Sequence, residues 1–113
     1  MLKGTFGPTL LAKCREKGAT PMAIKPLALT DWDTDEHPDY PFTWYRPVTD
    51  PELVGLCVRF TLDQGVSAAV PPGHEGLFFQ AVDAGDAYEP LSDEELVRLR
   101  EAAEPVKPLF PRG

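Results

Sequence analysis

The sequence predicts an α/β fold in which two short parallel strands alternate with helices. Helical periodicity and short apolar runs alternate along the chain, with helices expected at 6–18, 49–65, 75–85 and 92–104 and strands at 22–24 and 66–70. Strands separated by helices pair in parallel through a right-handed crossover. Two parallel strands alone cannot hide both faces of their sheet. The order of elements therefore indicates one portion of a larger α/β domain.

Length and composition set limits on the class of protein. The 113 residues, 42% of them hydrophobic, correspond to one partial domain over 1–113, with thirteen prolines marking corners between elements. A net charge of −7 disfavours a nucleic-acid partner. The sequence contains no apolar run of about 18 residues, so we expect neither a membrane span nor a signal peptide. The expected compartment is cytoplasmic.

The first helix and the first strand follow from proline and glycine positions. Pro8 suits the first turn of a helix, and Gly18 suits the position just past its end. The apolar run 22–24 is too short for a helix and predicts a buried parallel strand. Pro26 favours extended backbone at the preceding residue, so Lys25 is expected to be extended at the C-terminal mouth of this strand.

Residues 30–49 have no regular periodicity and predict a long irregular loop. The segment contains three prolines and five of the eleven aromatic residues of the chain. Loops of this length are usually functional or flexible, and the aromatic content favours packing. Trp32, Trp44 and Tyr45 are candidates to line a substrate pocket; the alternative is that they are exposed or packed on one another.

The later helices carry clear end signals. Asp50 or Thr49 can cap a helix whose wide apolar face, including Cys57, is expected to be mostly buried. The helix at 75–85 is predicted to turn four apolar side chains inwards: Leu77, Phe78, Ala81 and Val82.

Ser92 and Glu95 form an S-x-x-E capping box that opens the C-terminal helix, at about 92–104. The proline-rich tail after it is expected to be extended, with Leu109 and Phe110 holding it down.

Cysteine and histidine usage argues against a metal site. Cys14 and Cys57 fall on apolar helical faces and are expected to be buried free thiols. His37 lies among acidic residues but has no second histidine beside it and no metal-ligand spacing. We therefore predict no metal.

Three segments, in this order along the chain, resemble the C-terminal part of the aldo/keto reductase family. "FGPTLLAKCREKGATPMAIKPLAL" resembles the family's helix leading to "G-V-x-x-I-A-M-K-P-L". "LCVRFTLDQGVSAAVPPG" is similar to "A-L-R-(F/Y)-(V/T)-L-S-x-P-G-V-x-x-x-I-P-G", and "YEPLSDEELVRLREAA" is similar to the closing "P-L-S-E-E-E-L-x-x-L". Together these matches cover most of the chain.

The resemblance implies the C-terminal portion of a (β/α)8 TIM barrel that acts as an NAD(P)H-dependent carbonyl and alcohol oxidoreductase. Such barrels need roughly 200–250 residues, so this chain would supply the last two strands, their helices and the C-terminal helix. The family's catalytic Asp, Tyr, Lys and His belong to earlier strands that have no counterpart here. No catalytic residue is therefore expected, and the isolated chain is not expected to transfer hydride.

By the same resemblance, two turns would contact NADP or NAD. The positions matching the nicotinamide and pyrophosphate side are Lys25, Pro26 and Leu27, and those matching the adenosine-side phosphate are Pro71, Pro72, Gly73, His74 and Glu75. A glycine permits close backbone approach, and the amides of a helix N-terminus attract an anion. Glu75 would repel a 2′-phosphate, so a strong preference for NADP is not expected.

Other interpretations stay open at this point. Two interpretations of Lys25 stay open: a base or Schiff-base former, and a snorkelling or ion-paired lysine. We favour the second, because the sequence offers no identifiable partner base. His74 either contacts phosphate or acts as an acid, or is simply solvated. The whole chain is either this fragment or a non-catalytic nucleotide-binding or self-associating module. Its expected partner is a second copy covering open barrel edges, or the missing N-terminal barrel part if the sequence is a gene fragment.

Overall fold

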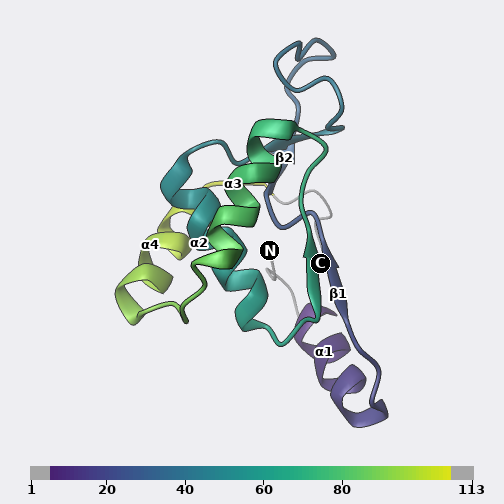
Figure 1. Cartoon of the computed structure of the whole chain (residues 1–113). Coiled ribbons are helices and arrows are strands. Elements are labelled where there is room, and N and C mark those ends of the chain that lie inside the picture. Colours follow the sequence, from purple (N-terminus) through teal and green to yellow (C-terminus); the bar gives the residue numbers. More distant parts are fainter. Residues whose placement is uncertain (1–5, 108–113) are drawn as a thin grey trace.

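The computed structural model describes residues 6–107, which form four helices and two small sheets (Figure 1). The predicted contacts of Leu109 and Phe110 lie outside these residues. The elements in chain order are α1 (Phe6–Lys17), β1 (Met22–Ile24), β2 (Ala28–Asp31), β3 (Tyr45–Pro47), α2 (Pro51–Asp63), β4 (Ala68–Val70), α3 (Glu75–Asp86) and α4 (Asp93–Ala103).

The two predicted strands, β1 and β4, pair in parallel, which confirms the α/β class. Met22 lies opposite Ala68, and Ile24 lies opposite Val70. The connection between them contains β2, β3 and α2, and α2 packs against β4. Parallel pairing therefore brings the carboxyl ends of both strands to the same edge of the sheet (Figure 1).

A second sheet occupies both ends of the segment expected to be an irregular loop. Strands β2 and β3 pair antiparallel, with Asp31 opposite Tyr45 and an irregularity in the register between Ala28 and Thr30. A backbone hydrogen bond of 2.8 Å from Val48 N to Leu27 O continues this contact. Strand β2 has four residues and β3 has three, too few for a sustained alternation of apolar and polar side chains. Pairing between residues distant in sequence therefore defines these strands, and no local sequence pattern does. Residues 32–44 form the irregular part.

Helix α2 forms the centre of the core. The Asp50 carboxylate caps it by accepting hydrogen bonds from the amides of Glu52 and Leu53 at 2.9 and 3.3 Å. Its predicted wide apolar face is confirmed, and Val54 is 1% exposed. The buried cluster around it consists of Leu27, Val48, Val54, Leu56, Cys57, Val58, Leu77, Ala81 and Leu99.

Helices α3 and α4 pack on α2, but α3 buries less than the sequence predicts. Leu77 and Ala81 are buried, whereas Phe78 and Val82 are 43% and 40% exposed. Leu77 and Ala81 join the buried cluster around α2, whereas Phe78 and Val82 lie beside this contact and are only partly covered within the described residues. The predicted capping box of α4 is confirmed in both directions, through Ser92 and Glu95.

The contact between α2 and α4 is anchored by one arginine. Arg59 pairs with both carboxylate oxygens of Glu95, at 2.5 and 3.0 Å, and also donates to the carbonyls of Glu89 and Pro90. This bidentate ion pair holds the pKa of Glu95 at about 2. The start of α4 is therefore held by charge as well as by the buried Leu99.

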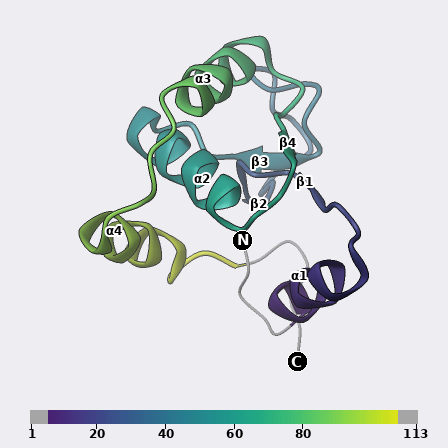
Figure 2. The ribbon, with the colours of Figure 1, turned by 60° about the horizontal axis from the view of Figure 1, so that its bottom comes forward.

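Helix α1 and the sheet β1–β4 are far more exposed. Both views show α1 apart from the group formed by α2, α3 and α4 (Figures 1 and 2). Met22 and Ile24 are 64% and 65% exposed, and Val70 beside Ile24 is 43% exposed. The strand at 22–24 thus exists, but the expectation that it is buried is wrong, because this face meets no other element among residues 6–107. Cys14 on α1 is half-buried rather than buried.

Candidate functional site

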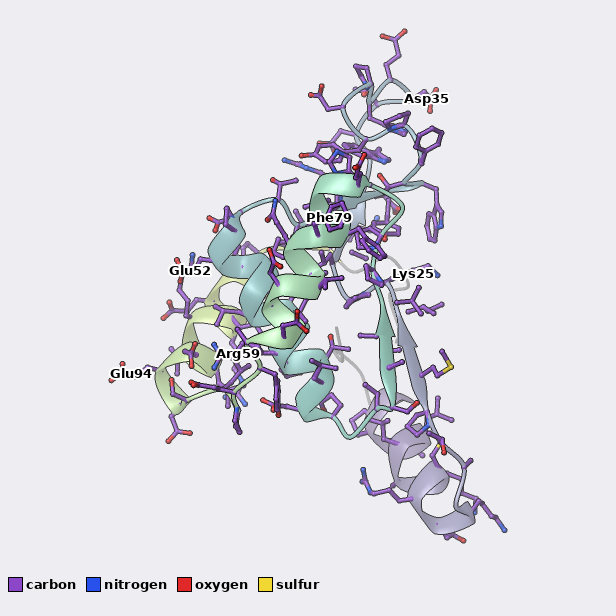
Figure 3. All side chains as sticks on the ribbon, viewed as in Figure 1. Lys25, Asp35, Glu52, Arg59, Phe79 and Glu94 are labelled. Carbon is purple, nitrogen blue, oxygen red and sulfur yellow. The ribbon has the colours of Figure 1, made fainter. Side chains whose placement is uncertain are left out.

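The candidate site lies at the carboxyl end of the parallel sheet. The segment after β1 begins with Lys25, and the segment after β4 contains the Pro-Pro-Gly turn that leads into α3. Figure 3 shows Lys25 at this end of the two strands, below the segment that carries Asp35. The structure therefore brings the two predicted cofactor-binding turns to one edge.

Lys25 does not have the extended backbone that Pro26 favours. Its φ is +58°, in the left-handed region, and its carbonyl accepts a hydrogen bond of 3.2 Å from Ala28 N. The chain thus turns tightly over four residues with Pro26 at the second position, where its fixed φ suits a turn. The expectation of an extended Lys25 is wrong, because the chain must turn here to start β2.

The three residues of this first turn have different surroundings. Leu27 is fully buried in the core, so its side chain is not exposed to a ligand. Pro26 is half-buried. The ammonium of Lys25 lies over the indole ring of Trp44, 4.9 Å from its centroid, which is within the range of a cation–π contact. Of these three, Lys25 has the side chain best suited to contact a ligand.

In the second turn, His74 caps helix α3. Its Nδ1 accepts a hydrogen bond of 3.2 Å from the backbone amide of Leu77. Gly76 leaves room for the ring, since a Cβ at Gly76 would lie 3.2 Å from Cε1 of His74. His74 is thus neither a purely solvated residue nor a side chain held towards an anion. It satisfies one of the amides that would otherwise attract a phosphate.

Gly73 and Pro72 connect this turn to the loop. Pro72 is buried, whereas Gly73 and Glu75 are exposed and Pro71 is half-buried. A Cβ on Gly73 would lie 3.7 Å from the carbonyl oxygen of Phe42 and 3.8 Å from its Cβ. The backbone of the loop therefore lies directly against the Pro-Pro-Gly turn.

A run of stacked rings fixes the loop on α3. His37 stacks on Trp32 with ring centroids 4.2 Å apart and planes 4° apart, and Trp32 stacks on Tyr40 at 6.3 Å. Tyr40 in turn meets the ring of His74 at 4.6 Å. Of the two alternatives for Trp32, packing on neighbouring rings describes its position. The loop is therefore packed on the helix cap, as its aromatic content predicts.

Hydrogen bonds from side chains to backbone carbonyls hold the end of the loop next to the site. The indole Nε1 of Trp32 donates to the carbonyl of Thr43 at 2.9 Å, and the Thr43 hydroxyl donates to the carbonyl of Tyr40 at 3.1 Å. Thr43 is 2% exposed. Sequence reasoning missed Tyr40 and Thr43, because neither belongs to a motif and their partners are set by the tertiary fold. The aromatic bias of the segment was the one available signal.

Trp44 and Tyr45 are adjacent but differ in exposure. Tyr45 begins β3 and is 6% exposed, and burial raises the pKa of its hydroxyl. Trp44 is 55% exposed, and its ring meets that of Tyr45 edge-on at 5.5 Å. Trp44 can therefore offer part of its indole to a ligand, whereas Tyr45 supports it from the core side.

A shallow depression of about 350 Å³ lies on the loop and is lined by Asp35, Glu36, His37, Pro38 and Pro41. Its two carboxylates disfavour the phosphates of a nucleotide. Between residues 6 and 107, no group of three or more His, Cys, Asp or Glu side chains is arranged to hold a metal ion. In the same part of the chain, no helix has the length and apolar character needed to cross a membrane.

Comparison with known proteins adds no assignment. Neither the family models, nor the curated proteins, nor the solved structures that were searched gave a match to this chain.

Proposed function

We propose that this chain is the C-terminal portion of an aldo/keto reductase-like TIM barrel, an NAD(P)-dependent oxidoreductase, and that it carries part of the cofactor-binding side. In this proposal it holds NAD or NADP at the carboxyl end of β1 and β4 and has no catalytic tetrad of its own. The isolated chain therefore does not transfer hydride. Its place is in the cytoplasm.

One observation carries the proposal. The parallel pairing of β1 and β4 gathers Lys25 and the 71–75 turn at one edge, and the loop around Phe42 lies against Gly73 there. Ligands of open parallel α/β sheets and of barrels bind at the carboxyl ends of strands. The order of sequence segments that resemble the family agrees with this placement.

The local chemistry sets the expected preference between the two cofactors. The amide of Leu77 is already bonded to His74, and the exposed carboxylate of Glu75 is in the first turn of α3. Both features weaken the attraction of this helix start for an additional phosphate. We therefore expect NADP⁺ to bind no more tightly than NAD⁺.

Calorimetric titration of the chain with NAD⁺ and NADP⁺ tests the proposal. Gly73→Ala is the informative variant, because its new methyl group makes ordinary van der Waals contact with Phe42 and leaves the fold intact. It should weaken binding about tenfold, equivalent to about 1.4 kcal/mol, by keeping the cofactor away from the backbone. Gly85→Ala is the matched control, since nothing lies within 4 Å of a Cβ there.

The proposal fails if the wild-type chain binds neither cofactor, or if the two alanine variants behave alike.

A second candidate, a self-associating module, is favoured by the exposed sheet face. Met22, Ile24 and Val70 form an apolar surface on a two-stranded parallel sheet, which such sheets do not normally leave open. A second copy, or a separate N-terminal barrel part, would cover it. Light scattering should then give more than one chain per particle, and Ile24→Thr should shift the particle towards monomer. A monomer with a cooperative melting transition would contradict this candidate.

A further inference from the structure

We propose that Lys25 and Trp44 together form a binding site for a flat aromatic ligand that carries a negative charge, such as an aryl carboxylate or a nucleotide. The inference rests on the proposed function for its location, and it adds a ligand class for the loop side of the same site. The two residues come from different elements and meet only in the folded chain, with the lysine Nζ 4.9 Å from the indole centroid.

The backbone of Lys25 is the first reason. A lysine with φ of +58° is strained, because its Cβ crowds the backbone, and a residue before proline rarely adopts this region. Such strain persists only where the surrounding structure imposes it, and it concentrates at ligand sites. Glycine would fit this conformation without strain. The conformation directs a cationic side chain over Trp44.

Trp44 supplies the second reason, a ring that is open to solvent yet rigidly held. It is 55% exposed, and next to it Phe42 is 84% exposed. Thr43 between them is buried and bonded to the loop, so both rings project from a fixed backbone. Aromatic rings pair favourably in offset-stacked arrangements, so an exposed and rigidly held indole offers a flat ligand ring a surface to stack on.

The positive charge of Lys25 gives the inference its specificity. The chain has a net charge of −7, so its overall field attracts cations and repels anions. Selective binding of an anionic ring must therefore come from a local positive group. The ammonium over Trp44 is placed to contact the charged group of a ligand whose ring stacks on the exposed part of the indole.

Titration of the full chain with 2-naphthoate tests the site, followed by calorimetry and by the indole NH signals of the two tryptophans. Trp44→Leu and Lys25→Met should each weaken binding about tenfold, and Lys25→Arg should restore most of it. Lys13→Met is the matched control, because Lys13 is an exposed lysine of α1 that pairs with Glu16. The signal of Trp44, not that of Trp32, should shift in the wild type, which gives a measurement that needs no substitution.

Two further probes identify the source of the ligand chemistry. The cationic analogue 2-naphthylmethylamine should not compete for the site, whereas 5′-AMP should compete if the natural ligand is a nucleotide. Competition by AMP that depends on Trp44 and Lys25 supports the site and identifies the natural ligand as a nucleotide. Naphthoate binding without competition by AMP supports the site and identifies the natural ligand as a small carboxylate.

Lys25→Gly separates a strained ligand residue from a structural one. It relieves the backbone and removes the ammonium, so it should weaken naphthoate binding as much as Lys25→Met does. The inference is overturned if this variant binds naphthoate as tightly as the wild type, if the cation binds as tightly as the anion, or if neither anionic ring binds. Measuring NAD⁺ in parallel keeps the two proposals apart. If naphthoate binds and NAD⁺ does not, the proposed function fails and the site at Lys25 and Trp44 stands; if NAD⁺ binds and neither anionic ring does, only the site is overturned.

Discussion

The two ends of this fold hide their apolar side chains to very different degrees. Around α2, helices α3 and α4 and the turn before β2 bury a continuous cluster in which Leu27 and Val54 are almost fully inaccessible. Around β1 and β4, the side chains of Met22 and Ile24 are about two-thirds exposed. An apolar side chain stabilises a fold only by the area it removes from water. The region around α2 therefore provides most of the stability, whereas the region around β1 and β4 leaves apolar surface exposed to solvent.

The candidate site lies where the two regions meet, with Lys25 at the end of the exposed sheet and His74 at the start of a helix packed on the core. Loops that carry binding residues are usually positioned by a rigid scaffold of this kind. Here the ring stack from His37 to His74 ties the loop to the packed half.

The largest expected effect tests the difference in packing directly. Leu27→Ala removes a fully buried side chain and should lower the free energy of unfolding by about 2–5 kcal/mol. Ile24→Ala, three residues earlier and 65% exposed, should cost only about 0.5–1 kcal/mol. Urea unfolding monitored by circular dichroism measures both. Similar losses for the two variants would show that β1 is covered in solution.

A pH effect should appear in the packed half through Glu95. Its pKa is about 2 in the folded chain against an ordinary value of 4.5, because Arg59 and the Ser92 amide bind the carboxylate. The stabilisation is therefore complete above about pH 4.5 and is lost as the pH falls towards 2. Urea midpoints between pH 6 and pH 2.5 should fall in the wild type and fall less in Glu95→Gln. Equal slopes for the two proteins would argue against the ion pair.

The smallest effect concerns the two thiols, one in each region. Burial raises the pKa of the Cys57 thiol to about 11, so at pH 8 it is protonated and shielded. Cys14 is half-buried on α1 and should react with a disulfide reagent at least about tenfold faster than Cys57 in the native chain. Absorbance at pH 8 should show one fast equivalent, and Cys14→Ser should remove it. Two fast equivalents would mean that the core around α2 opens readily.

The sequence alone determined the features that depend on neighbouring residues. The caps Asp50 and Ser92, the apolar face of α2 and the positions of both parallel strands could all be predicted, because each is encoded within a few residues. Parallel pairing was also predicted, and it places the carboxyl ends of both strands at one edge of the sheet. The cofactor and family assignments stay predictions.

Only the tertiary structure decided which of these faces are covered and where side chains meet. Ile24 and Phe78 are apolar residues on regular elements, yet they are exposed, because burial needs a partner surface that no local pattern encodes. The contact of Lys25 with Trp44 and the contact of the Tyr40 ring with His74 depend on how β2 and the loop turn back. Long-range packing overrode the local preference of the residue before Pro26, and it produced the strained lysine on which the proposed ligand site depends.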